Sequence, residues 1–156
     1  MVNFTGFLET AESGGSHDIF AALDSLIQHE VGALICSCST FDPATQQAKR
    51  IYSNQLEAYP LSGLKQIVPN RWTDIVLMQG KVFIANTLAE IAEVFPDPEL
   101  IHSLGCGSVM NMPLQLAGRF LGTINILHEP GYFTPERQKM FERLKPAGII
   151  AFCSHS

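Results

Sequence analysis

The chain has 156 residues, of which 46% are hydrophobic and 16% are charged, and its formal net charge is −5. This length suits one domain, and the apolar fraction excludes an intrinsically disordered chain. No apolar run is long enough to cross a bilayer, and an acidic chain lacks the basic face that binds a nucleic-acid backbone.

Charge is distributed unevenly along the chain. Residues 1–48 contain six acidic residues and no Lys or Arg, whereas the remainder carries nine acidic and ten basic residues. An opening segment without a cation fits neither a secretory signal nor a mitochondrial presequence. Cys36 and Cys38 lie on one face of a predicted strand, where they are poorly placed to bridge each other. We therefore expect a cytoplasmic protein that binds neither nucleic acid nor membrane.

The first elements are a helix and two strands. Residues 1–15 are predicted to be a flexible lead-in, and residues 16–156 to form a single domain. Apolar residues at helical spacing follow the lead-in and predict a helix that ends at Gly32. The apolar character of residues 31–41 indicates a buried strand, and residues 49–53 a second one.

The middle of the chain is irregular. Residues 54–69 contain several turn-forming residues and no clear period. Trp72 lies on the apolar face of a predicted helix over residues 72–79, and residues 82–85 predict a short strand. Two further short helices are expected, one capped at Thr87 and the other beginning at Asp97.

A long hairpin is the clearest prediction. Residues 108–116 and 119–129 are apolar runs joined by an Ala-Gly turn. Gly122 indicates a bulge or a close approach by another segment. The last helix should begin at Thr134, and Pro146 should kink or divide it because proline lacks a backbone donor.

The residues of this second half resemble those of the GAF domain family. The resemblance rests on Ser108-Val-Met-Asn-Met-Pro113-Leu, Gly118, Leu121-Gly122-Thr-Ile-Asn-Ile-Leu and Phe133-Thr-Pro-Glu136. It covers residues 16–153 and implies an α+β fold, a GAF-like (profilin/PAS-like) antiparallel sheet of five to six strands. The N- and C-terminal helices would lie on one face, and short helices and loops would cover a pocket on the other.

Departures from the family pattern bear on the ligand. The chain has no Asn-Lys or Asp-Glu dipeptide, which the cyclic-nucleotide-binding branch carries, and no Cys-His dipeptide for covalent attachment of a bilin. Asn86 stands where many family members place Asp. The resemblance therefore implies a small-molecule ligand without naming the ligand or a cofactor.

Eight residues of the strands and the irregular segment are the candidate ligand-binding set. Asn111 and Asn125 are the most informative, because a polar side chain within an apolar strand needs a partner if it is buried. Each could instead face solvent, and Trp72 could belong to the core. The full set is Tyr52, Trp72, Ser108, Met110, Asn111, Thr123, Asn125 and His128.

A catalytic cysteine and a metal site are the alternatives to a ligand-binding pocket. A GAF-fold group reduces free methionine-R-sulfoxide with a cysteine thiolate, for which Cys106 is the candidate here. That group's other cysteines fall in the middle of the chain, where residues 39–105 contain none. The spacing of Cys36, Cys38, His102 and Cys106 is no established zinc pattern, so no metal site is predicted.

The function expected from the resemblance is that of a non-catalytic sensory domain. It would bind a small molecule and transmit occupancy to a partner or to its own dimer, formed through the terminal helices. The alternatives are a methionine-R-sulfoxide reductase and a ligandless dimerisation module. Opposite charges are expected to face each other across the terminal helices, within one subunit or between two, and involve Asp18, Asp24, Glu30, Arg137, Lys139, Arg143 and Lys145.

Overall fold

A six-stranded antiparallel sheet forms the centre of the molecule, as the resemblance implies. The computed structural model describes residues 1–62 and 64–155. The strands lie in the order β3-β2-β1-β6-β5-β4. Their bounds are Ile35–Asp42 (β1), Gln47–Ser53 (β2), Lys65–Gln66 (β3), Phe83–Ala85 (β4), Ser108–Leu116 (β5) and Arg119–His128 (β6).

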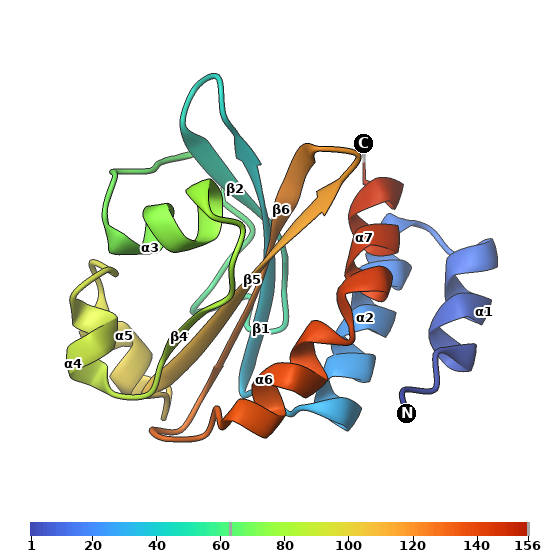
Figure 1. Ribbon diagram of the computed structural model, residues 1–156. Coiled ribbons are helices and arrows are strands. Elements are labelled where there is room, and N and C mark those ends of the chain that lie inside the picture. The colour runs from blue at the N-terminus through green and yellow to red at the C-terminus, as the bar shows by residue number, and fades with distance from the viewer. Residues whose placement is uncertain (63, 156) are drawn as a thin grey trace.

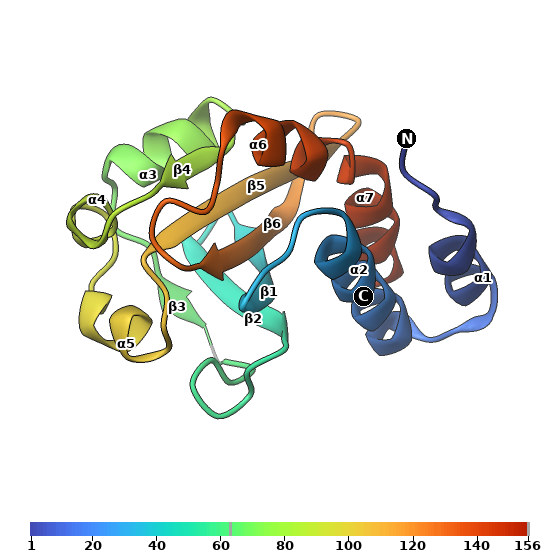
Figure 2. The same cartoon turned by 90° about the horizontal axis from the view of Figure 1, so that it is seen from below.

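The terminal helices cover one face of the sheet (Figure 1). These are α1 (Thr5–Ser13), α2 (Ser16–Glu30), α6 (Pro135–Glu142) and α7 (Lys145–Ser154). Helices α2 and α7 lie side by side, and α1 lies outside them (Figure 2). The other face is covered by α3 (Arg71–Thr73), a π-helical turn η1 (Asp74–Met78), α4 (Leu88–Ala92) and α5 (Pro98–Ser103).

Side-chain alternation along the hairpin separates an apolar face from a polar one. Met110, Met112 and Leu114 belong to the apolar cluster formed with the terminal helices. Asn111 lies between them in sequence and therefore faces the short helices, because successive side chains of a strand point to opposite faces. In β6, Asn125 lies directly opposite Asn111.

A bulge in β2 changes which residues face the short helices. Cys38 of β1 pairs with Tyr52, whereas the next residue, Ser39, pairs with Arg50, so Ile51 is the extra residue. In a regular strand Arg50 and Tyr52, two residues apart, would share a face. With the bulge, Tyr52 packs in the cluster under the terminal helices, and Arg50 faces the opposite side of the sheet.

Several expected elements are confirmed. The hairpin has the expected pairing, and Thr87 accepts a hydrogen bond from the backbone of Glu90 at the start of α4. A Cβ at Gly122 would collide with the carbonyl oxygen of Ser39 and the ring of Phe152, which confirms a close approach there. The last helix is divided, and Pro146 lies in the first turn of α7, where its missing donor costs no helical hydrogen bond.

Two segments are more ordered than the sequence indicates. Residues 5–13 of the expected flexible lead-in form α1, which buries Phe7 against the rest of the protein. The irregular stretch after β2 contains β3, whose residues Lys65 and Gln66 pair with the start of β2. Local periodicity misses both because a long-range contact stabilises each of them.

Asn86 joins the end of β4 to the segment that precedes α6. Its side-chain amide donates to the carbonyl oxygen of Phe133 (3.0 Å), and its Oδ1 accepts from the Phe133 backbone N–H (3.1 Å). An aspartate could accept the second bond and could not donate the first while ionised. An amide is therefore required at this position for both bonds.

The charge pairing expected within one subunit is not observed. Among the described residues, no ion pair joins the terminal helices, and the one that forms is Arg71 with Glu93 on the opposite face. Asp24 is buried and accepts a hydrogen bond from the Tyr52 hydroxyl (2.7 Å). Arg137 lies over the ring of Tyr132. Asp24 and Arg137 thus interact with polar and aromatic neighbours instead of with opposite charges on the terminal helices.

Candidate ligand-binding site

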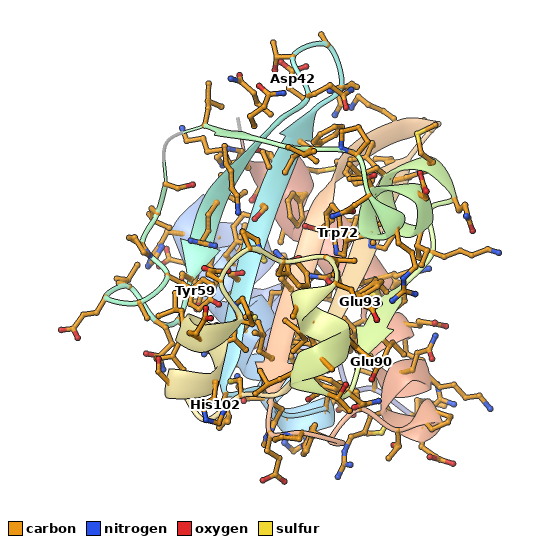
Figure 3. All side chains as sticks on the ribbon, turned by 90° about the vertical axis from the view of Figure 1, so that its left-hand side faces the viewer. Asp42, Tyr59, Trp72, Glu90, Glu93 and His102 are labelled. Atoms are coloured by element: carbon orange, nitrogen blue, oxygen red, sulfur yellow. The ribbon has the colours of Figure 1, made fainter. Side chains whose placement is uncertain are left out.

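A cavity of about 170 Å³ lies between the sheet and the short helices. Figure 3 looks onto this side of the molecule, with Tyr59 to the left of Trp72. The apolar part of its wall comes from Trp72, Leu77, Phe95, Ile101, Val109 and Leu127. A concave space with apolar walls and a few polar groups is typical of sites for small ligands.

Six polar residues of the cavity wall belong to two adjacent rows that cross the strands. In one row Asn111, Asn125 and Ser37 lie opposite one another on β5, β6 and β1. In the next row Thr123 of β6, Ser39 of β1 and Arg50 of β2 are paired in the same way. All six residues line the cavity.

A chain of hydrogen bonds runs along the first row. The indole N–H of Trp72 donates to Asn111 Oδ1 (2.9 Å), and the amide of Asn111 donates to Asn125 Oδ1 (2.8 Å). The amide of Asn125 is then within 3.4 Å of Ser39 Oγ and 3.5 Å of Ser37 Oγ. The last two contacts are long, so the Asn125 amide retains donor capacity toward the cavity.

Arg50 is the half-buried cation of the second row. Its Nη1 donates to the carbonyl oxygen of Pro60 (3.1 Å), and its guanidinium carbon lies 4.7 Å from the ring centre of Tyr59. Its Nε is buried and has no hydrogen-bond partner among the described residues. An unsatisfied buried donor costs about 1–3 kcal/mol, so this group would gain from an acceptor.

Burial also shifts the pKa values of Arg50 and Tyr59. It lowers the pKa of Arg50, although the nearby Tyr59 and Asp97 oppose the shift. Burial and the negative charge of Asp97 raise the pKa of Tyr59 to about 12. Tyr59 is therefore a neutral hydroxyl at physiological pH, and Arg50 is the charged group of the pair.

The structure brings four of the eight candidate residues together at the cavity: Trp72, Asn111, Thr123 and Asn125. The other four lie elsewhere. Tyr52 and Met110 pack under the terminal helices. The Ser108 hydroxyl donates to the carbonyl oxygen of Glu129 (2.7 Å) and lies 3.2 Å from that of His128, and the His128 ring stacks on Tyr132. These four side chains are engaged in the core or at the end of the hairpin.

Sequence reasoning missed Arg50, Ser37 and Ser39. The alternation Cys-Ser-Cys-Ser in β1 already indicates one polar and one apolar face, and this signal could have found both serines. No such signal exists for Arg50. Strict alternation assigns it the same face as Tyr52, and only the bulge separates them.

The environment of Cys106 is unfavourable for nucleophilic catalysis. Its side chain is 1% exposed, and burial raises the pKa of the thiol to about 11. Cys36 and Cys38 lie in the other apolar cluster, on the opposite face of the sheet. In the parts of the chain that the structure describes, no three His, Cys, Asp or Glu side chains are grouped as metal ligands.

Thiol reactivity tests this description of the cysteines. Cys153 is exposed and the other three are buried, so Ellman's reagent at pH 8 should titrate one fast thiol in the native protein and four after denaturation. A thiol with a pKa near 11 is about 0.1% ionised at that pH. Cys153→Ser should remove the fast phase. A fast phase that survives this change and disappears in Cys106→Ser would show an activated Cys106 instead.

Among the described residues, no helix combines the length and the apolar character needed to cross a membrane. No protein-family model matches the chain, and no curated protein matches its sequence. The similarity found by comparison with known proteins is therefore one of structure.

Three solved structures illustrate this similarity. The GAF domain of a phosphoenolpyruvate-protein phosphotransferase from Coxiella burnetii matches 95% of this chain and 88% of its own, with a TM-score of 0.72 and 14% identity. The corresponding domain from Acinetobacter matches 97% and 92%, with a TM-score of 0.71 and 11% identity. The GAF domain of a two-component sensor histidine kinase from Bacillus halodurans matches 86% and 91%, with a TM-score of 0.67 and 13% identity. The chain has the fold of a GAF domain.

Proposed function

We propose that this protein is a sensory domain that binds a small molecule in the cavity between the sheet and the short helices. The observation that carries the proposal is the combination of apolar walls with the polar rows on β1, β5 and β6. Polar groups at fixed positions orient a ligand, and apolar walls supply contact area. The GAF domain of a sensor histidine kinase has the same fold, which supports a sensory role.

Ligand binding would link the irregular segment to the sheet. Tyr59, Trp72 and Leu77 come from that segment, whereas the polar rows belong to the strands. A molecule that contacts both would restrict the motion of residues 54–80. Ordering of a segment by a ligand can change the association of a distant surface without a large structural change.

A route from the cavity to the terminal helices passes through β6. Thr123 lines the cavity, and the next residue, Ile124, faces the terminal helices. Gly148 of α7 lies so close to Ile124 and Leu114 that a Cβ there would be within 2.8 Å of each side chain. A shift of β6 would therefore displace α7, and the terminal helices are the surface through which we propose that a homodimer forms and reads occupancy.

The two alternatives are less well supported. A methionine-R-sulfoxide reductase needs an accessible thiolate, which the burial of Cys106 opposes. A ligandless dimerisation module needs no polar residues on the covered face of its sheet. The presence of Asn111, Asn125 and Thr123 on that face favours a ligand site.

Filling the cavity should abolish binding. In a thermal-shift screen of small polar metabolites, we expect a ligand present at 100 times its Kd to raise Tm by about 5–10 °C. Ser39→Leu places a larger side chain between Thr123 and Arg50 and should remove the shift. Ser13→Leu, at the exposed end of α1, makes the same chemical change away from the cavity and should keep it. No stabilising compound, or a shift that survives Ser39→Leu, would contradict the proposal.

Transmission can be measured separately from binding. A compound that stabilises the protein should slow amide hydrogen exchange across residues 54–80 and change the dissociation constant of the dimer. Lys139 of α6 and Arg143, which directly follows that helix, are exposed, so Arg143→Glu should weaken a dimer that pairs these cations with the acidic α2 of a second copy. Unchanged exchange at saturation, or a chain that stays monomeric at all concentrations, would contradict this mechanism.

A further inference from the structure

We infer that the ligand of this cavity carries a carboxylate group and that Arg50 binds it. The inference rests on the proposed function and adds the chemical class of the ligand. It starts from the one half-buried cation of the cavity wall and from the hydrogen bonds that this cation makes and lacks.

The guanidinium of Arg50 donates a hydrogen bond through Nη1. Nη1 donates to Pro60 O (3.1 Å), and the Tyr59 ring covers one face of the group. Nε is buried without an acceptor. Among the described residues, Nη2 has no hydrogen-bond partner either. Nε and Nη2 form the edge of a guanidinium that matches the two oxygens of a carboxylate.

The charge of Arg50 is opposed at a distance by Asp97 and by no direct ion pair among the described residues. In the described part of the chain no carboxylate lies within ion-pair distance of it. Asp97 is the one carboxylate of the cavity wall and is exposed, and Lys65 adds a second, exposed cation. The wall therefore carries more positive than negative charge, and an anionic group of the ligand would supply the missing partner.

The remaining wall favours a carboxylate with an uncharged body. A single half-buried guanidinium is suited to a planar monoanion, whereas a phosphate group usually has several backbone or cationic donors. Ser39 of β1 lies opposite Arg50, and Thr123 and Asn125 lie one strand further along, on β6; all three offer neutral hydrogen-bonding groups to the cavity. The apolar side of the cavity, with Trp72 and Phe95, would contact the hydrocarbon part of the molecule.

Matched pairs of probes test the inference with the full-length protein. Isothermal titration would compare isovalerate, benzoate and L-leucine with their primary amides, which have the same shape and lack the carboxylate. We expect at least one carboxylate to bind at least tenfold more tightly than its amide. This comparison uses the wild-type protein, so it does not depend on how a variant folds.

Substitution of Arg50 then identifies the anchor. Arg50→Gln should weaken carboxylate binding by about 10- to 100-fold and leave amide binding unchanged. Arg50→Lys keeps the charge without the planar edge and should lie between the two. Lys49→Gln is the matched control, because Lys49 precedes Arg50, is exposed and does not line this cavity. Asp97→Asn should tighten binding of a simple carboxylate and weaken that of the zwitterionic leucine.

The outcomes separate this inference from the proposed function. If neutral compounds bind and Ser39→Leu abolishes that binding, while no carboxylate exceeds its amide, the inference is overturned and the proposed function stands. If Arg50→Gln and Lys49→Gln have the same effect on carboxylate binding, Arg50 is not the anchor and the inference is again overturned. If no probe and no screened metabolite binds, both fail.

Discussion

The amide of Asn111 has to find its hydrogen bonds inside the protein, because it lies in the middle of a strand and is 3% exposed. It accepts from the indole of Trp72 and donates to Asn125. The first bond fixes α3 over the sheet, and the second aligns the polar row on the strands beneath it. Thus the Asn111 side chain positions both α3, which lies over the cavity, and the polar row of the strands beneath it. A sheet covered on both faces usually buries apolar residues on each of them, so a polar row at this position is unusual and points to a role beyond packing.

The two faces of the sheet differ in how their polar groups are paired, and the β2 bulge contributes to this difference. Tyr52 is turned toward the terminal helices, where its hydroxyl satisfies the buried carboxylate of Asp24. Arg50 is turned toward the cavity, where no described residue accepts a hydrogen bond from its Nε. The apolar face thus has its polar groups paired internally, whereas the cavity face retains unsatisfied capacity. Thr123 and Ile124 are consecutive in β6 and face the cavity and the terminal helices respectively, so under the proposed function they would connect a bound ligand to those helices.

Much of the fold could be predicted from the sequence, since the hairpin, the capped helices and the division at Pro146 depend on local patterns. Helix α1 could not, because the burial of Phe7 against distant residues stabilises it. The site was predictable where alternation is regular, which identifies Asn111 and Asn125. Alternation fails at the bulge, so Arg50 was missed and Tyr52 was included. Ser108 and His128 have polar side chains in apolar strands, as Asn111 does, and no local pattern shows that backbone and ring contacts at the end of the hairpin occupy them.

Under the proposed function, a small molecule binds in the cavity beneath Trp72. Trp72 is the only tryptophan of the chain, so its indole N–H gives a single, readily assigned resonance in a nitrogen–proton correlation spectrum. That proton lies in the hydrogen bond to Asn111, at the wall of the cavity. Saturation with a compound that raises Tm should shift this resonance, and Ser39→Leu should prevent the shift. An indole resonance that stays in place while the compound stabilises the protein would show that binding occurs elsewhere and would contradict the account.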